Sequence, residues 1–389
     1  MRIGIDMRAL AQGRSSGVEE YVKQLLSAVF SIDHTNEYIL FFNAWKNVQP
    51  DLRWAEEFPN VSVRRFHIPN KLLNFFLWYA HFPKLDKLMG GVDIFFMPNI
   101  NFGRVSSRAK FLLTVHDLSF EHYAQTFSLK RRVWHFFVNP KALCTAADGI
   151  IAVSDATHDD LRETYGIFAN KVSTIHSAVP ARYRVIDRND ISLFSVREKY
   201  NVPYKFILSL STIEPRKNIV SIIRAYAALR DRGQKELAQY KLVIAGERGW
   251  KWRAIEEEIV RSPYSEDILR IGFIADEDKP ALYNLASLFV YPSFYEGFGF
   301  PPLEAMQCGT PVITSNVSSL PEIVGDAAIM IDPDRPDELY RAMKEILLNQ
   351  NLHTHLRTKG MERARQFSWH KSAEQFLALV KKMKSESTT

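Results

Sequence analysis

The stretch Leu288–Gln307, LFVYPSFYEGFGFPPLEAMQ, joins a short apolar run to a helical pattern through a loop rich in glycine and proline. The run Ser287–Pro292 predicts a buried strand. The segment Leu303–Cys308 predicts a helix, because two prolines precede it and proline is tolerated in a first helical turn. Strand and helical patterns alternate in this way along the whole chain, which indicates an α/β protein.

Two carboxylates, Glu296 and Glu304, flank the glycines of this loop. Glycine allows the backbone to approach a ligand closely. Amides at the start of a helix can meet an anion. A carboxylate on each side of such a loop suits a ligand that joins a phosphate to polyhydroxyl groups. The pattern therefore favours a nucleotide sugar.

Composition restricts the class of protein. The chain has 389 residues, which makes two domains the default, and its 46% hydrophobic and 24% charged residues are typical of a soluble globular protein. The net charge of +6 and the pI of about 9.1 fit an anionic ligand, an anionic membrane surface, nucleic acid or ordinary surface solubility. Cys144 and Cys308 are too far apart for a C-x-x-C site, which favours a reducing compartment and no structural zinc.

Short apolar runs predict parallel sheets that are covered on both faces. In the first half, a helix is expected over residues 17–30 and strands at Ile3–Asp6, Tyr38–Phe42, Ile94–Met97, Phe111–Val115 and Gly149–Val153. In the second half, strands are expected at Phe206–Leu210, Lys241–Ala245, Ile268–Ile271, Leu288–Tyr291, Pro311–Thr314 and Ala328–Ile331.

The pattern breaks between Ala178 and Tyr204, where prolines and a polar run predict a linker. We therefore expect two Rossmann-like domains, over residues 1–185 and residues 200–371. An amphipathic helix over Ser372–Lys384 ends the chain, and the segment 372–389 is expected to pack back on the first domain. Ser154, Asp155 and Thr157 are interpreted as the N-terminal cap of a helix over residues 156–165.

With these segments in place, the chain resembles the retaining family-4 glycosyltransferases of the GT-B fold, and within them the bacterial mannosyltransferases. The resemblance implies two Rossmann-like domains that face each other across a cleft. Residues 1–185 would form the acceptor-side domain and residues 200–371 the domain that binds the nucleotide sugar. It rests on Ser211–Asn218, Tyr295–Met306, Cys308–Ile313, Ser319–Ala328, Gly13–Val18 and Thr114–Asp117.

The resemblance assigns chemical roles to four residues. Arg216 and Lys217 are expected to bind the donor diphosphate, since arginine offers a planar fork and lysine a mobile point charge; a solvated basic loop is the alternative. Glu296 is expected to approach the transferred sugar and Glu304 to hold the ribose hydroxyls. For Glu304, a favourable charge in the first helical turn is the other interpretation.

Further residues complete the expected site. His116 is expected near the primary hydroxyl of the sugar, although a structural histidine is the alternative. Phe273 and Ile274 are expected to meet the nucleobase through backbone groups, with ordinary turn chemistry as the competitor, and the rings of Phe298 and Phe300 to pack. The remaining donor-binding residues are expected to be Gly17, Gly246, Gly297, Phe298, Gly299 and Leu303.

The reaction implied by the resemblance is transfer of a hexose to a hydroxyl with retention. Mannose from GDP-mannose is the expected donor, and a UDP-sugar such as UDP-glucose is the alternative. The resemblance implies that Arg216, Lys217 and amides at a helix start stabilise the departing diphosphate in place of a metal, so no metal and no other cofactor are expected. An epimerase, a phosphorylase and a non-catalytic nucleotide-sugar-binding protein are competing hypotheses.

The acceptor is expected to be a saccharide or a lipid-linked oligosaccharide. Residues 122–147 contain four lysines and arginines and no acid, with Trp134, Phe136 and Phe137 between them, and residues 71–87 are similar in kind. Basic and aromatic residues together suit an anionic membrane surface, although aromatic rings packed inside are the alternative. We therefore expect a cytoplasmic protein, peripheral at the inner face of the membrane, and no nucleic-acid partner.

Overall fold

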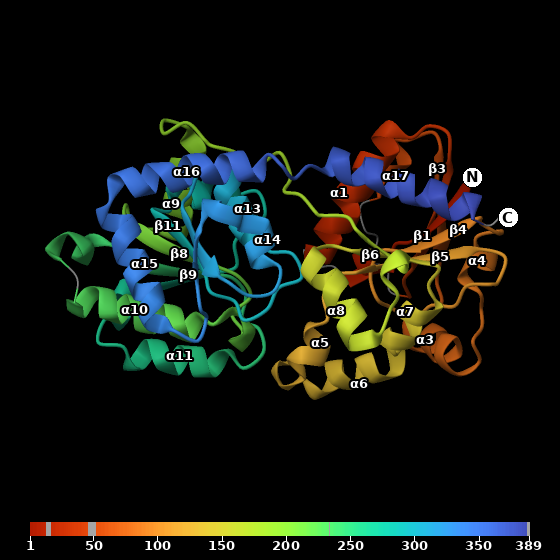
Figure 1. The fold of residues 1–389 in the computed structure, drawn as a ribbon, viewed down its shortest axis with the longest axis horizontal. Helices are drawn as coiled ribbons and strands as arrows, with labels where there is room; N and C mark the ends of the chain where they lie inside the picture. Colours follow the sequence, from red (N-terminus) through yellow and green to blue (C-terminus); the bar gives the residue numbers. More distant parts are fainter. Residues whose placement is uncertain (13–16, 46–51, 233, 387–389) are drawn as a thin grey trace. The chain divides into compact units, whose positions relative to one another are not determined.

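The computed structural model describes residues 1–12, 17–45, 52–232 and 234–386, and the chain forms two compact units (Figure 1). The N-terminal unit comprises Met1–Phe120, Leu129–Ala178 and Ser368–Thr389. The C-terminal unit comprises Glu121–Ser128 and Val179–Phe367. The last helix of the chain is therefore part of the N-terminal unit.

The N-terminal unit is built on a parallel sheet of seven strands in the order β3-β2-β1-β4-β5-β6-β7. The strands are β1 (Arg2–Asp6), β2 (Glu37–Asn43), β3 (Val61–Phe66), β4 (Ile94–Met97), β5 (Lys110–Val115), β6 (Gly149–Ala152) and β7 (Val172–Thr174). All five predicted strands are present. The two edge strands were not predicted, because β3 carries exposed Arg64 and Arg65 and β7 has only three residues.

Helices lie around the sheet of the N-terminal unit, and the longest of them, α1 and α17, bury an apolar stripe. In α1 the stripe consists of Tyr21, Val22, Leu25, Leu26, Val29 and Phe30. Ser154 caps α8 by accepting from the amide of Thr157 at 3.0 Å, as predicted. The helices are α1 (Gly17–Ile32), α2 (Arg53–Glu56), α3 (Asn70–Tyr79), α4 (Leu85–Leu88), α6 (Leu129–Val138), α7 (Pro140–Ala146), α8 (Asp155–Tyr165) and α17 (Trp369–Ser385); α5 (Ser119–His122) crosses the unit boundary.

Helix α17 packs on this sheet through aromatic and hydroxyl side chains. The ring of Phe376 lies 5.0 Å from that of Phe96 on β4, and both are buried. Ser372 Oγ donates to the carbonyl of His176 at 2.7 Å. These contacts hold the C-terminal segment on a unit whose remaining residues all lie before Val179.

The C-terminal unit has a six-stranded parallel sheet in the order β10-β9-β8-β11-β12-β13. This is the 3-2-1-4-5-6 order of a doubly wound Rossmann sheet. Its strands are β8 (Phe206–Leu210), β9 (Lys241–Ala245), β10 (Ile268–Gly272), β11 (Leu288–Tyr291), β12 (Val312–Ser315) and β13 (Ile329–Ile331). All six predicted strands are present, with ends shifted by at most one residue.

Eight helices among the described residues of the C-terminal unit pack around this sheet. They are α9 (Ile191–Tyr200), α10 (Ile219–Arg232), α11 (Trp252–Arg261), α12 (Lys279–Leu285), α13 (Phe300–Gln307), α14 (Leu320–Val324), α15 (Pro336–Leu348) and α16 (Gln350–Ala364). The prediction of a linker through residues 178–204 is wrong where α9 forms. Its only buried side chains are Leu193 and Val196, so the sequence shows no helical stripe, and Asp190 starts the helix by capping the amide of Ser192 at 2.8 Å.

Within the described ranges, no helix combines the length and the apolar character needed to cross a bilayer. Cys144 and Cys308 are both free and buried. Burial raises the pKa of the Cys144 thiol to about 12, which keeps this side chain protonated and apolar.

Candidate active site

In the C-terminal sheet, the order in which successive strands are added reverses between β8 and β11. Strands β8 and β11 are hydrogen-bonded neighbours, although β9 and β10 lie between them in the sequence. The chain continues from β8 to β9 on one side and from β11 to β12 on the other side. Ligands of open α/β sheets bind at this kind of switch point. The loops that carry Arg216, Lys217 and Glu296 both start there.

The loop after β8 lies against the loop after β9. The amide of Ile213 donates to Glu247 O at 2.8 Å, and the amide of Gly249 donates to Ile213 O at 3.0 Å. Gly246 has a φ of +131°, and a Cβ at this position would lie 1.8 Å from the carbonyl oxygen of Ser211. Only glycine fits this close approach, so Gly246 fixes the path of the loop that leads to Arg216.

A single turn of 3-10 helix, Pro215–Lys217, presents the two cations. It ends at Asn218, whose left-handed backbone (φ +54°) lets α10 begin at the next residue. The side chain of Asn218 donates to Pro333 O at 2.7 Å. The turn is therefore fixed at its end, and Arg216 and Lys217 project from a rigid support.

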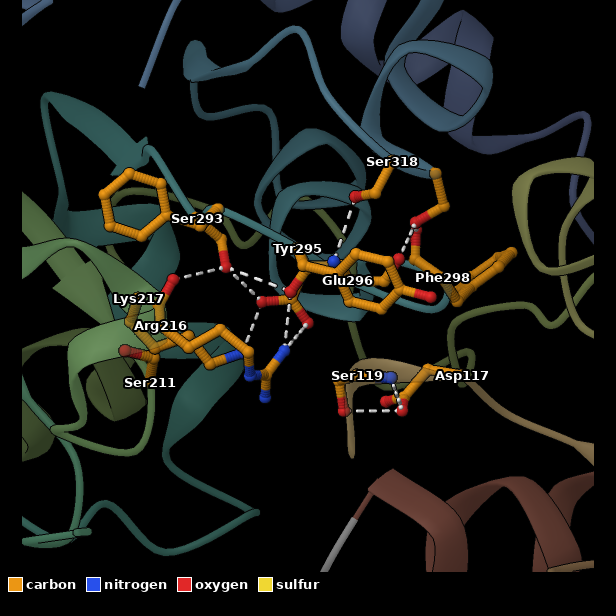
Figure 2. A network of polar contacts seen from close by, with 12 residues as sticks. Asp117, Ser119, Ser211, Arg216, Lys217, Ser293, Tyr295, Glu296, Phe298 and Ser318 are labelled. Carbon is orange, nitrogen blue, oxygen red and sulfur yellow. Dashed lines mark hydrogen bonds and ion pairs between the residues drawn. The ribbon is translucent and has the colours of Figure 1, made fainter. Parts of the chain in front are cut away.

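The cations meet the carboxylate of Glu296. Lys217 Nζ lies 2.5 Å from Glu296 Oε1, and Arg216 Nη1 lies 3.2 Å from Glu296 Oε2. Tyr291 OH and Ser293 Oγ donate to the same Oε1 at 2.9 and 2.6 Å. Figure 2 shows Arg216, Lys217 and Ser293 converging on Glu296. The sequence predicted that these charged residues share one site. It did not predict that both cations form ion pairs with Glu296 in the absence of a ligand.

The electrostatics follow from burial and from this pairing. Burial alone would raise the pKa of Glu296, but the charges of Lys217 and Arg216 outweigh it and lower the pKa to about 2. Burial, with the nearby Arg216, lowers the pKa of Lys217. Arg216 Nη2 also pairs with Glu214 Oε1 at 3.0 Å. Two cations thus face two carboxylates, and the cluster carries no net charge.

Serine hydroxyls hold the backbone of the Glu296 loop, and these residues were not predicted. Ser318 Oγ accepts from the amide of Glu296 at 2.9 Å. Ser319 Oγ lies 2.9 Å from Glu296 O and 2.8 Å from Phe298 O, and donates to these carbonyls. Both serines precede α14, and Ser319 is the first residue of the Ser319–Ala328 motif that the resemblance used. Their position beside Glu296 depends on the fold, because more than twenty residues separate them in sequence.

Helix α13 begins at Phe300. The expectation that several amides at its start can meet an anion does not fit its first residues. Proline has no N–H group, so Pro301 and Pro302 leave Phe300 as the only amide donor among the first three helical residues. Gly299 at the N-cap has a φ of +107° and makes no side-chain cap. The amides that could meet an anion therefore lie mainly in the loop Gly297–Phe300, and the helical turn itself offers few donors.

Glu304 lies at the fifth residue of α13, beyond the first turn. The interpretation of Glu304 as a charge in the first helical turn is therefore wrong. Its Oε2 accepts from Tyr283 OH at 2.8 Å. Burial raises the pKa of Glu304, in contrast to Glu296. The two glutamates of the motif thus have different surroundings, and Tyr183 is a second hydroxyl within hydrogen-bonding reach of Glu304.

The remaining donor-binding candidates differ in exposure. Leu303 and Ile274 are buried, so neither offers an exposed side chain to a ligand. Phe298 is buried and its ring lies 5.1 Å from that of Phe300, whereas Phe273 is 56% exposed. The exposed Phe273 ring is the one apolar surface that this set offers to a planar ligand.

In the N-terminal unit, His116 follows β5 and has a defined tautomer. Its Nε2 donates to Pro98 O at 2.8 Å, and its ring packs edge-on against Tyr21 at 4.7 Å. Burial lowers the pKa of His116 more than Pro98 O and Asp117 raise it. The ring is therefore neutral, with Nδ1 as an acceptor. Gly17 opens α1, and residues 13–16 of the same motif lie outside the described residues.

Two sequence families match nearly the whole chain. Residues 15–183 match "Glycosyltransferase Family 4", and residues 193–363 match "Glycosyl transferases group 1". The O-antigen chain mannosyltransferase B of Escherichia coli is 34% identical over 269 residues, which cover 69% of each chain. The serotype-specific mannosyltransferase WbdA of E. coli is 37% identical over 244 residues, or 61% of this chain, and that match spans only 29% of WbdA.

Solved structures support the same fold. The sucrose-phosphate synthase of Thermosynechococcus elongatus superimposes with a TM-score of 0.75 over 99% of both chains, at 22% identity. At this identity the structural similarity supports the fold alone. Membership of the family rests on the two matching family models and on the E. coli relative. The chain is a glycosyltransferase and belongs to family 4 of the GT-B glycosyltransferases.

Proposed function

We propose that this enzyme transfers mannose from GDP-mannose to a hydroxyl of a saccharide or lipid-linked oligosaccharide, with retention of configuration. The Lys217–Arg216–Glu296 cluster at the β8/β11 switch point is the observation that carries this proposal. The choice of mannose rests on relatives at 34–37% identity that are named mannosyltransferases. The O-antigen name of one relative supports an acceptor in cell-surface polysaccharide synthesis.

Arg216 and Lys217 bind the pyrophosphate of the donor in this proposal. Because the cluster is neutral without ligand, the diphosphate must share the two cations with Glu296 and Glu214. Binding then places the sugar beside Glu296, whose carboxylate stays ionised because the pKa is about 2. An ionised carboxylate at this point accepts hydrogen bonds from sugar hydroxyls and stabilises positive charge near the anomeric carbon.

The reaction breaks the bond between the anomeric carbon and the β-phosphate oxygen. The acceptor oxygen forms the new bond on the same face, and the departing phosphate takes the acceptor proton. Lys217 and Arg216 stabilise the negative charge that develops on the diphosphate. Glu304, with one oxygen bound to Tyr283, holds the ribose hydroxyls. We expect this electrostatic work to need no metal ion.

A screen of nucleotide sugars tests the proposal. GDP-mannose, UDP-glucose and their relatives are incubated with the protein and a sugar-lipid acceptor, and the released GDP or UDP is measured. Release of GDP from GDP-mannose alone is the expected result. Preferred release of UDP would favour the UDP-sugar alternative, and binding without any release would indicate a non-catalytic nucleotide-sugar-binding protein.

We further propose that an aromatic surface on α3 and α6 docks on an anionic membrane. The surface comprises Phe75, Phe76, Trp78, Tyr79, Phe136 and Phe137, all at least 37% exposed. Trp78 and Phe137 join the two helices, with rings 5.0 Å apart. The interpretation that these rings pack inside is wrong, except for Trp134, which contacts the core.

Positive charge accompanies this surface. Lys71 on α3 and Lys130, Arg131 and Arg132 on α6 are exposed. Exposed aromatic rings insert at the boundary between headgroups and acyl chains, and lysine and arginine nearby attract anionic lipids. This combination supports a peripheral enzyme that meets a lipid-linked acceptor at the membrane surface.

A further inference from the structure

Tyr291, the last residue of β11, carries a hydroxyl that contacts both charges of the Lys217–Glu296 pair. Its OH lies 2.7 Å from Lys217 Nζ and 2.9 Å from Glu296 Oε1. A lysine ammonium has donors only, so the hydroxyl accepts from Lys217 and donates its one proton to the carboxylate. The three polar groups therefore form a closed triangle in which the phenol bridges the two charges.

The two oxygens of Glu296 differ in the partners that they have. Oε1 accepts from Lys217 Nζ at 2.5 Å, from Tyr291 OH at 2.9 Å and from Ser293 Oγ at 2.6 Å. Oε2 lies 3.2 Å from Arg216 Nη1. Three contacts fill the acceptor capacity of Oε1, whereas a carboxylate oxygen with one contact can accept a further hydrogen bond. Oε2 is therefore the oxygen with capacity left for a ligand.

The ring of Tyr291 is fixed by its surroundings. The residue is 2% exposed, and its ring stacks on that of Phe289, two residues earlier on the same strand, with centroids 5.9 Å apart. Its backbone carbonyl accepts from Thr314 Oγ1 at 2.9 Å, and these two residues are paired across β11 and β12. The hydroxyl is therefore held at one point, whereas Lys217 reaches the site through a flexible four-carbon chain.

We propose that Tyr291 is a positioning residue of the transfer reaction, which holds the Glu296 carboxylate in place while Lys217 turns to the donor diphosphate. Of the three N–H groups of Lys217, one meets Glu296 and one meets Tyr291, and the described part of the chain gives the third no hydrogen-bond partner. A phosphate oxygen that binds this third N–H competes with Glu296 for the ammonium. Because the phenol is fixed, it keeps its hydrogen bond to Oε1, and Glu296 retains its orientation toward the sugar.

A purely structural role for the phenol is the competing explanation, since a buried ion pair is stable only when further hydrogen bonds satisfy it. The two explanations differ in what the loss of the hydroxyl changes. A structural hydroxyl contributes to the free energy of unfolding and leaves the turnover of the folded enzyme unchanged. A positioning hydroxyl changes kcat, and it does so only when position 296 carries the carboxylate that the phenol orients.

Tyr291→Phe tests the proposal, because it removes the hydroxyl and keeps the ring. Release of GDP from GDP-mannose, in the presence of a sugar-lipid acceptor, gives kcat and KM. A hydrogen bond to a charged group corresponds to a factor of about 10–100, so kcat is expected to fall by this factor. KM for GDP-mannose is expected to stay within about threefold of wild type, because Arg216 and Lys217 still bind the diphosphate and the lost interaction acts in the transition state.

A double-mutant cycle with Glu296→Gln shows whether Tyr291 acts through Glu296. In the Glu296→Gln background, Tyr291→Phe is expected to lower kcat by less than about twofold, because no charge is left to orient. Tyr226→Phe is the matched control, since Tyr226 is also buried and its hydroxyl accepts from Arg230 at 3.1 Å and donates to Tyr240 O at 2.9 Å. Tyr226 lies on α10, outside the site, and this control should keep wild-type turnover.

The inference rests on the proposed function, because it gives Tyr291 a part in that reaction. Calorimetric titration with GDP checks that each variant is folded. Wild-type kcat for Tyr291→Phe, or an equal loss of kcat in both backgrounds, overturns the inference. Loss of turnover in Lys217→Ala and Glu296→Gln but not in Tyr291→Phe refutes the inference alone, whereas wild-type turnover by Lys217→Ala and Glu296→Gln refutes the proposed roles of these two residues. Release of UDP from UDP-glucose instead of GDP refutes the choice of mannose, and the same cycle on UDP-glucose then decides the role of Tyr291.

Discussion

Lys217 Nζ lies 2.5 Å from Glu296 Oε1, although 79 residues separate them in the sequence. Both side chains are about nine-tenths buried, at 10% and 11% exposure. A buried pair of opposite charges is costly to form, because both groups lose their hydration. Removal of one partner destabilises the folded protein, because the other charge stays buried without compensation. The retention of the pair at the β8/β11 switch point is explained if a ligand uses both charges.

Lys217→Ala is expected to reduce turnover by a factor of about 10²–10³, because it removes a charge that stabilises the departing diphosphate. Glu296 keeps Arg216, Tyr291 and Ser293 as partners, so the fold survives. The rate of nucleoside diphosphate release measures the effect. Lys205→Ala, an exposed lysine at the start of β8, is the control. Turnover within twofold of wild type would remove Lys217 from the assignment.

Glu296→Gln is expected to separate binding from catalysis. Removal of the negative charge frees Lys217 and Arg216 for phosphate, so GDP should bind as tightly as in wild type or up to about tenfold more tightly. The loss of the carboxylate beside the sugar should lower kcat by about 10² or more. Calorimetric titration with GDP and steady-state kinetics give the two quantities. The control is Glu257→Gln, whose side chain is 63% exposed. Parallel loss of GDP affinity and kcat would contradict the assignment.

The pH dependence of stability follows from the pKa of Glu296, which falls from the ordinary 4.5 to about 2. The unfolded chain binds a proton near pH 4.5 that the folded chain does not bind until about pH 2. The contribution of Glu296 to the free energy of unfolding is therefore complete above pH 4.5 and is lost as the pH falls toward 2.

Between pH 5 and pH 3, wild type should lose about 2 kcal/mol more stability than Glu296→Gln. Urea unfolding of both proteins at several pH values measures the difference. All other acidic groups are the same in the two proteins, so their contributions to the free energy of unfolding cancel. Identical pH profiles for the two proteins would show that the ion pair does not lower this pKa.

Gly246→Ala is expected to destabilise the protein and to disturb the diphosphate loop. A Cβ would lie 1.8 Å from Ser211 O, and the φ of +131° is unfavourable for alanine. Gly272→Ala is the matched control, because Gly272 also has a positive φ (+72°) but has open space around its Cβ position. The control should cost about 1 kcal/mol. Thermal unfolding should show at least twice that loss for Gly246→Ala, and equal losses would refute the close approach.

Membrane docking predicts that the double variant Tyr79→Ser/Phe136→Ser binds anionic vesicles at least tenfold more weakly than wild type. The two side chains are 71% and 79% exposed, so their replacement leaves the fold intact. Co-sedimentation with phosphatidylglycerol vesicles at low salt measures binding. Phe168→Ser, also at a 79% exposed position, is the control. No binding of wild type, or equal binding of both variants, would contradict a role for this surface.

The sequence predicted most of the fold because buried parallel strands are continuous apolar runs with polar and glycine-rich ends. It did not predict β3, which is half exposed, or α9, which buries only Leu193 and Val196. The candidate site was predicted through adjacent residues such as Arg216 and Lys217. Ser318 was not predicted, since a single polar residue carries no pattern until the chain folds.

Local sequence alone determined the strands, the two-part organisation and the residues that carry charge, because each depends on neighbours within a few positions. Tertiary structure alone decided that Lys217 and Arg216 are paired with Glu296 and that Tyr291 contacts both Lys217 and Glu296. The physical reason is the switch in strand order, which brings the ends of distant strands together at one edge of each sheet.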